Sequence, residues 1–418
     1  MESLIAIILY CLVTVLLVYY EKRKFGTIFN MIFFLAAPFA IMLILSYIFI
    51  ETFGFYALNA KIVYVWLFAI IVFFCVGNFV TFGYRYKQKA TNSGASNSTK
   101  RKNNTLLTKN FKLVTSLIIA LVLIKIMSEF ISEGFSLSVS EALFSGGLWG
   151  HLLVALCAIG IIYFGQLKIS DLWSDLNLIG VFMLLFLANV KTDIILVLAG
   201  GLICRVLMGK LKLRLKVVIF AAIGACVVFF AIYVLDFCLQ RGRFALDKNT
   251  LKFIFNHLFY YLFSGIGGFG TYIKGSYSLD MSLLFAPVDN ILKFLGLING
   301  GYINIINESV QVGPNLDTNV ATLMGEVYMA GELIAVFIFS SCIAIVSYLL
   351  YKRARRGHVF SMIAVSYISA MLIIGIFGNP FWRLSVIEVP FYVFIIYFCK
   401  RFFSKKRKGA SQMVLNRG

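Results

Sequence analysis

The stretch SLIAIILYCLVTVLLVYYEKRK, residues 3–24, joins a long apolar run to three consecutive basic residues, Lys22, Arg23 and Lys24. A helix needs about 20 mostly apolar residues to cross a bilayer, and the run is close to that length. No basic residue precedes it and no small-residue cleavage site follows it, so we expect a retained first helix and not a secretory signal. The sequence therefore opens on a predicted membrane span.

The composition extends this prediction to the whole chain. Of 418 residues, 61% are hydrophobic and 13% are charged, whereas soluble domains carry about 45–50% apolar and about 25% charged residues. Five prolines and the lack of alternating short strands disfavour a β-barrel. The eight cysteines lie mostly in apolar runs without a CxxC pair, so neither a disulfide framework nor a metal site is expected. We predict an all-α, polytopic transmembrane helical bundle.

Apolar segments recur along the chain, and basic clusters follow every odd-numbered one. Short cytoplasmic loops collect Lys and Arg, which places the N-terminus outside and the C-terminus in the cytoplasm. This placement accounts for the net charge of +20 without nucleic acid as a partner. No internal repeat is evident, which disfavours inverted-repeat transporters. The eleven predicted spans are 3–20, 28–50, 61–84, 112–132, 148–165, 174–190, 193–208, 215–235, 328–351, 359–378 and 384–400.

The spans divide the chain into three predicted regions. Residues 1–235 form an N-terminal bundle of eight spans with a cytoplasmic basic loop at 85–111, and residues 328–418 form C-terminal helices with a basic cytoplasmic tail. Between them, residues 236–327 form one large outward-facing loop that is expected to contain short helices. Long loops are usually functional, so we expect the site on the outer side.

The stretch DFCLQRGRFALDKN, residues 236–249, places Arg241 and Arg243 one residue apart on that outer side. Guanidinium groups bind phosphate bidentately, which makes a lipid-linked pyrophosphate a candidate ligand. The alternative is that both side chains snorkel to ordinary headgroups. Lys252 adds a cation to the same outward loop and favours the phosphate interpretation. Lys191 and Arg383 are two further outward cations. Their alternatives are a local ion pair with Asp193 for Lys191 and snorkelling for Arg383.

Three outward side chains are candidates for proton transfer: His257, Asp317 and Glu326. Histidine titrates near working pH, although a lone histidine at an interface is more often structural. Asp317 has the alternative role of capping the helix that follows. Glu326 lies where the chain is expected to enter the bilayer, where an ionisable group is costly and marks a functional hypothesis, or else a headgroup-level acid.

The stretch YYLFSGIGGFG, residues 260–270, formally contains GxGxxG. The βαβ context that a dinucleotide site needs is missing, so nucleotide binding is not expected. We expect the glycines to let the backbone bend near the membrane surface. The flanking aromatic residues suit the interface or stacking on sugar rings.

At this point the chain resembles Wzy-type oligosaccharide repeat-unit (O-antigen or capsule) polymerases. Asn319, Val320, Thr322, Tyr328 and Gly331 resemble the Asn-Val…Thr…Tyr…Gly stretch before a late helix of that family. YYLFSGIGGF is similar to the aromatic-then-Gly segment of its large periplasmic loop. The number of spans and the arginine-bearing outer loop fit the family over most of the chain.

The resemblance implies a multi-pass glycosyltransferase of the bacterial inner membrane. It would polymerise undecaprenyl-pyrophosphate-linked repeat units into O-antigen or capsular polysaccharide at the outer leaflet, without metal or cofactor. Its partners would be the lipid-linked donor and acceptor, membrane lipid and, as a further candidate, a chain-length regulator protein. Asp317, Glu326 and His257 would be catalytic candidates, and Arg241, Arg243, Arg383, Lys191 and Lys252 would bind pyrophosphate. The acceptor and its sugars would contact Tyr260, Tyr261, Asn319 and Tyr328.

Two alternatives remain open. A flippase or other transporter of lipid-linked oligosaccharide predicts paired halves and several deep ionisable residues, whereas Lys125 is the one near mid-span. An O-antigen ligase relies on a histidine in its large loop, which FNHLF around His257 matches in part.

Overall fold

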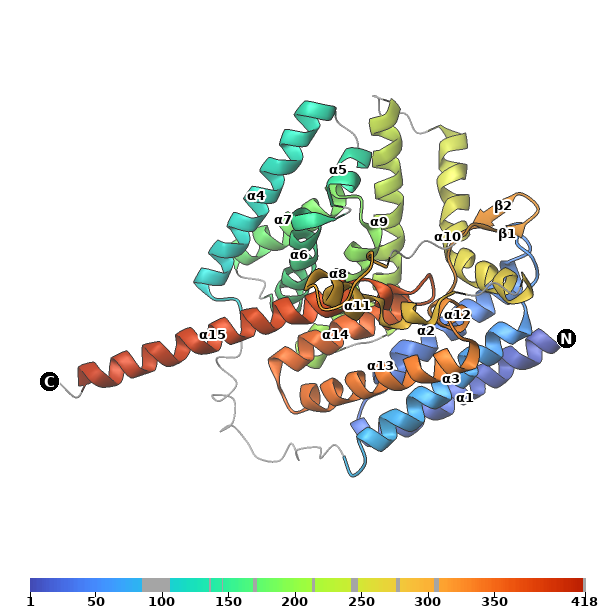
Figure 1. Ribbon diagram of the computed structural model, residues 1–418, viewed down its shortest axis with the longest axis horizontal. Coiled ribbons are helices and arrows are strands. Elements are labelled where there is room, and N and C mark those ends of the chain that lie inside the picture. Colours follow the sequence, from blue (N-terminus) through green and yellow to red (C-terminus); the bar gives the residue numbers. More distant parts are fainter. Residues whose placement is uncertain are drawn as a thin grey trace. The chain divides into compact units, whose positions relative to one another are not determined.

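The computed structural model describes residues 1–84, 106–134, 137–144, 146–167, 171–212, 215–241, 247–275, 279–303 and 308–415. The chain is mostly helical, as predicted, with one small antiparallel hairpin in the described part (Figure 1). Each predicted apolar segment coincides with a helix: α1 (Glu2–Phe25), α2 (Met31–Phe49), α3 (Ala60–Val80), α4 (Lys109–Glu133), α6 (Gly147–Gln166), α7 (Leu172–Leu187), α8 (Lys191–Leu207), α9 (Leu215–Arg241), α13 (Glu332–Arg355), α14 (Val359–Ile374) and α15 (Ser385–Leu415).

Six described helices are long and apolar enough to cross a membrane: α1, α2, α3, α4, α6 and α13. Two more, α7 and α14, are apolar but shorter. These helices are those of a membrane-embedded protein. The count of eleven spans and the orientation of the chain stay predictions, and the basic loop 85–111 lies mostly outside the described residues.

The chain forms two compact units, each built from segments that are separate in sequence. Unit 1 comprises Met1–Ala90, Leu215–Arg353 and Ile368–Val386. Unit 2 comprises Thr91–Arg214, Ala354–Tyr367 and Ile387–Gly418. Unit 1 therefore combines residues from all three regions of the sequence.

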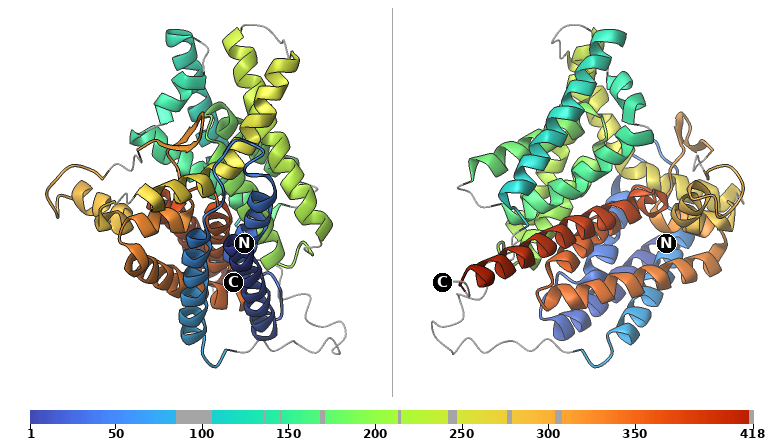
Figure 2. Two further views of the ribbon diagram at one scale, coloured as in Figure 1. Left: turned by 90° about the vertical axis from the view of Figure 1, so that its right-hand side faces the viewer. Right: turned by 60° about the vertical axis from the view of Figure 1, so that its left-hand side comes forward.

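In unit 1, α1, α2 and α3 pack side by side, and α13 lies against them (Figures 1 and 2). The α3–α13 contact is close at Gly77, where an added Cβ would lie 2.2 Å from the Tyr348 ring. The end of unit 1 that carries Lys22, Arg23 and Lys24 is called the basic end here, and polar contacts join its helices. Lys24 donates to the Asn78 side chain at 2.8 Å, and the Tyr348 hydroxyl donates to the buried carboxylate of Glu21.

The long segment between α9 and α13 is folded and largely helical in its described part. It contains α10 (Lys248–Gly275), η2 (Met281–Phe285), α11 (Ala286–Phe294), the strands β1 (Val310–Gly313) and β2 (Leu316–Thr318), and α12 (Leu323–Met329). The polar, glycine-rich stretch that follows residue 253 continues one long helix, α10. The hairpin β1–β2 was not predicted.

In unit 2, α6 and α8 approach closely because glycines face the partner helix. A Cβ on Gly160 would lie 2.8 Å from Val197, and one on Gly201 would lie 2.1 Å from Phe164. Small residues that let backbones approach are typical of helix contacts in membranes. The remaining elements of unit 2 are α4, α5 (Leu137–Phe144), α7, α15 from Ile387 and the first part of α14.

Candidate functional site at the hairpin end of unit 1

The hairpin lies against the connection between α2 and α3. The Tyr56 backbone N–H donates to the Val312 carbonyl at 2.8 Å. A Cβ on Gly313 would lie 2.0 Å from the Gly54 carbonyl oxygen, so only glycine fits there. We call the part of unit 1 formed by residues 50–62, α10, the hairpin and α12 the hairpin end.

The glycines of α10 are contact points for this end. A Cβ on Gly268 would lie 2.0 Å from the Val320 carbonyl oxygen, and one on Gly265 would lie 2.7 Å from the Ile376 carbonyl oxygen. The Thr322 N–H donates to the Gly265 carbonyl at 3.1 Å. The GxGxxG pattern is therefore used for close backbone packing within a helix.

Thr322 caps α12. Its hydroxyl accepts from the Gly325 N–H at 3.2 Å and from the Trp66 indole N–H at 3.0 Å. Trp66 is fully buried and stacks on Phe39 with ring centroids 4.0 Å apart. The expectation that Asp317 caps the following helix is wrong because Asp317 lies in β2, five residues before the capping side chain.

A shallow pocket, partly open to solvent and with an enclosed volume of about 10 Å³, lies between residues 56–62 and α10. Its polar lining comes from Asn59, Thr271 and Lys274, with the phenol of Tyr56 beside them. Gly267 and Gly270 contribute bare backbone to one wall. Its enclosed volume is about that of one water molecule and far below that of a typical ligand site. A substrate would therefore rest on these residues at the surface and not inside a cavity.

Lys61 adds a second cation at the hairpin end. It follows Asn59, whose side chain caps α3, and its ammonium lies 5.4 Å from the centre of the Tyr328 ring. Tyr328 also contacts Phe269, with ring centroids 6.0 Å apart. A lysine over an aromatic face forms a cation–π contact. Tyr328, predicted to contact sugars, is thus held beside a positive charge.

The three acid–base candidates have different surroundings. Glu326 is 5% exposed, and its Oε1 accepts from the Ala321 N–H at 3.5 Å. A Cβ on Gly378 would lie 3.7 Å from the same oxygen, so this carboxylate faces protein. Asp317 is exposed. His257 lies in a ring cluster with Tyr233, Phe253, Tyr260 and Tyr261.

The structure brings Tyr260 and Asp317 together through backbone and not through the two side chains. The Tyr260 hydroxyl donates to the Asp317 carbonyl oxygen. Burial is the main cause that raises the pKa of this phenol. The hydroxyl therefore stays protonated at neutral pH and ties α10 to β2. Tyr261 is exposed next to it, and Asn319 is exposed beyond β2.

The predicted pyrophosphate cations are not shown as one group. Lys252 is exposed on α10, and Arg383 is exposed directly after Trp382, which is buried with Leu283 and Ala330. Arg241 ends α9, but its side chain lies outside the described residues, as does all of Arg243. The fifth predicted cation, Lys191, begins α8 in unit 2.

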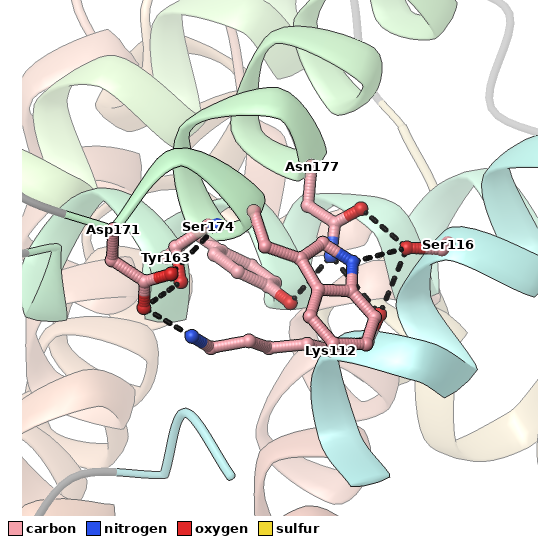
Figure 3. A network of polar contacts seen from close by, with 7 residues as sticks. Lys112, Ser116, Tyr163, Asp171, Ser174 and Asn177 are labelled. Atoms are coloured by element: carbon pink, nitrogen blue, oxygen red, sulfur yellow. Dashed lines mark hydrogen bonds and ion pairs between the residues drawn. The ribbon is translucent and has the colours of Figure 1, made fainter. Parts of the chain in front are cut away.

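Unit 2 has its own polar network, which joins α4, α6 and α7 through Lys112, Ser116, Tyr163, Asp171, Ser174 and Asn177 (Figure 3). Asp171 caps α7, and hydrogen bonds from Lys112 and Ser174 lower the pKa of its carboxyl. Asn177 bridges the Lys112 carbonyl and the Tyr163 hydroxyl, each at 3.0 Å. Every residue of this network forms a hydrogen bond with another, which indicates that the network holds α4, α6 and α7 together.

Residues 54–406, which are most of the chain, match a family of unknown function, DUF6337. The chain belongs to the DUF6337 family. No curated protein and no solved structure matches the chain.

The DUF6337 match begins at Gly54 and so contains α3, α10, the hairpin and α12. Sequence reasoning did not single out Lys61 or Trp66 in this region. Lys61 had a detectable signal, because a lysine two residues after an Asn cap stands at the positive end of a helix, where a cation is unfavourable without another purpose. Trp66 had none, since its partner Thr322 is distant in the sequence.

Proposed function

We propose that this chain is an integral-membrane glycosyltransferase that joins undecaprenyl-pyrophosphate-linked oligosaccharide repeat units into O-antigen or capsular polysaccharide. The reaction takes place at the outer leaflet of the bacterial inner membrane. The acceptor hydroxyl oxygen bonds to the anomeric carbon of the donor glycan. The bond from that carbon to the pyrophosphate oxygen breaks, and undecaprenyl pyrophosphate leaves with the electron pair.

The proposal is carried by one observation: three segments far apart in sequence join at the hairpin end and present lysines beside aromatic rings. Lys274 and Tyr56 line the pocket, and Lys61 lies over Tyr328. Ammonium groups stabilise the charge that develops on a leaving pyrophosphate, and aromatic faces suit sugar rings. Arg241 and Arg243 remain the proposed bidentate phosphate ligands.

The test uses a strain in which the gene is deleted and then complemented. Deletion should leave lipid-linked glycan at a single repeat unit, and the wild-type gene should restore long chains. Lys274→Ala and Lys61→Ala should each lower the yield of long chains about 10-fold or more, because each removes a charged contact to the substrate. Lys22→Ala is the matched control, since Lys22 is an exposed lysine at the basic end of unit 1.

The outcomes separate the functions. Long chains of wild-type length in the deletion strain would refute the proposal. An absence of lipid-linked glycan from the outer leaflet would favour the flippase. Lipid-linked polymer that accumulates without transfer to its final acceptor would favour the ligase. If deletion gives the single-repeat phenotype but both lysine variants polymerise normally, the function stands and the pocket is not its phosphate site.

A further inference from the structure

The segment of unit 1 between α10 and the hairpin carries an apolar stripe that the proposed reaction does not use. The stripe runs along η2 and α11 and consists of Met281, Phe285, Val288 and Leu295, which are 40%, 49%, 47% and 60% exposed. Their spacing of four, three and seven residues places them close to one helix face. A contiguous row of large exposed apolar side chains marks a contact surface.

The polar side of α11 is turned towards the chain itself. Asn290 accepts from the Ile303 N–H at 2.7 Å and donates to the Ile303 carbonyl at 3.1 Å. A helix at the surface of a water-soluble protein does the reverse, because its apolar stripe faces the core and its polar face meets water. The inverted orientation of α11 is the one expected of a helix whose outer face meets an apolar medium.

The turn after α11 extends the apolar surface. Phe294, Leu297 and Tyr302 are 75%, 67% and 65% exposed. Lys293 precedes Phe294 in the last turn of α11. Tyrosine is enriched at membrane–water interfaces, and lysine can lay its stem along lipid while its ammonium reaches the headgroups. The side chains of the turn therefore suit the boundary between acyl chains and water.

The stripe begins beside a helix that can span the membrane. A Cβ on Gly331, directly before α13, would lie 3.0 Å from Met281 Cε. The helix α13 is one of the six that are long and apolar enough to cross a bilayer. In its first turns Ile334 and Phe337 are 68% and 52% exposed. The exposed stripe of η2 and α11 thus continues the lipid-facing surface of α13 at the end of that helix.

The side of the segment opposite the stripe is fixed to unit 1. Leu283 is buried together with Ala330 and Trp382, and both η2 and α11 contact η3 (Pro380–Trp382). The stripe is therefore held in place on the surface of a folded element. Lipid at the level of the end of α13 is the medium that this surface meets.

We propose that η2, α11 and the turn up to Tyr302 lie in the plane of the membrane interface, with the apolar stripe among the acyl chains of bilayer phospholipid. Such helices bury their apolar face about 5–10 Å into the boundary between headgroups and acyl chains. The proposal does not depend on the proposed function. It makes this part of the predicted outward loop a membrane-bound element instead of a loop in water.

The test measures the fluorescence of single added tryptophans in the full chain, reconstituted into phosphatidylcholine vesicles with or without bromine on the acyl chains. Phe285→Trp, Leu295→Trp and Leu297→Trp probe the surface, and the wild type, with its four tryptophans, supplies the background to subtract. Phe337→Trp is the lipid-facing control, and Asn315→Trp, exposed between β1 and β2, is the water-facing control. Bromine should quench the three probes to within about twofold of Phe337→Trp. Iodide in the water should quench chiefly Asn315→Trp.

The position of the bromine along the acyl chain reports the orientation of the segment. Phe285 and Leu295 are separated by about 15 Å along a helix axis, which is about half the thickness of the hydrocarbon core. An in-plane helix predicts that the same bromine position quenches both probes most strongly. Different positions for the two probes would show a segment that enters the bilayer steeply and would overturn the proposal.

Two other outcomes would also overturn it. Iodide quenching of the three probes as strong as that of Asn315→Trp would place the segment in water. Protection from both bromine and iodide would show that protein covers the stripe, either a second copy of the chain or another partner. The vesicles contain no lipid-linked glycan, so failure of the proposed function leaves these results unchanged.

Discussion

Replacing Gly268 by alanine tests the close approach of α10 to the segment after the hairpin. The added Cβ would lie 2.0 Å from the Val320 carbonyl oxygen, and ordinary contact begins near 3.4 Å, so the two backbones would have to separate by about 1.4 Å. That movement stretches the bond from the Thr322 N–H to the Gly265 carbonyl, now 3.1 Å, beyond hydrogen-bonding range.

Three contributions decide whether Gly268→Ala raises or lowers the free energy of unfolding. Overpacking costs about 1–3 kcal/mol, and the lost hydrogen bond costs about 1 kcal/mol. Alanine gains about 1 kcal/mol over glycine in a helix. The net effect of Gly268→Ala is a loss of about 1–3 kcal/mol, which corresponds to a thermal midpoint lower by about 2–10 °C for a unit of this size.

The assay is thermal unfolding of the purified full chain in detergent, followed by the fraction that remains monodisperse. Gly224→Ala in α9 is the matched control, because its Cβ would meet no described atom within 4 Å and helix propensity alone should hold or raise the midpoint. A Gly268→Ala midpoint at or above that of the wild type would show that α10 and residue 320 are not in contact.

Two further predictions concern charge. Arg241→Ala or Arg243→Ala should abolish long-chain glycan at unchanged membrane level, whereas lysine at either position should restore it only in part, since the bidentate fork is lost; normal polymer length in both alanine variants would refute the phosphate clamp. Asp171 has a pKa lowered chiefly by Lys112, so its stabilisation is present above the unfolded value of about 4 and is lost as pH falls through the folded value. Thermal midpoints should therefore decline more steeply for the wild type than for Asp171→Asn below about pH 4, and parallel declines would contradict this.

Hydropathy was sufficient to locate most helices because burial in lipid and burial in protein impose the same apolar composition. It failed at α10 for a physical reason. Asn256, His257 and the glycines lower the mean hydropathy, yet the helix buries Phe263 and Phe269 within unit 1. The spacing of the apolar residues in α10 is that of a helix with one buried face, although the mean hydropathy of the segment does not indicate a helix.

The site was less predictable because its contacts join distant segments. The glycines of α10 were predicted to serve a bend, and the structure uses Gly265 and Gly268 for contact with backbone at Ile376 and Val320. No local pattern encodes those partners. The same holds for Trp66, whose hydrogen-bond partner Thr322 is distant in the sequence.

The choice among the acid–base candidates rests on the surroundings of each group. Glu326 is buried and accepts a backbone hydrogen bond, so turning towards a hydroxyl would break that bond. Asp317 is exposed, so water solvates its carboxylate. Imidazole accepts a proton near neutral pH, where a general base is most effective. Polymerisation that depends on a histidine should therefore fall as the pH falls through the neutral range, whereas dependence on a carboxylate would preserve activity into the acid range. The pH at half activity decides between them.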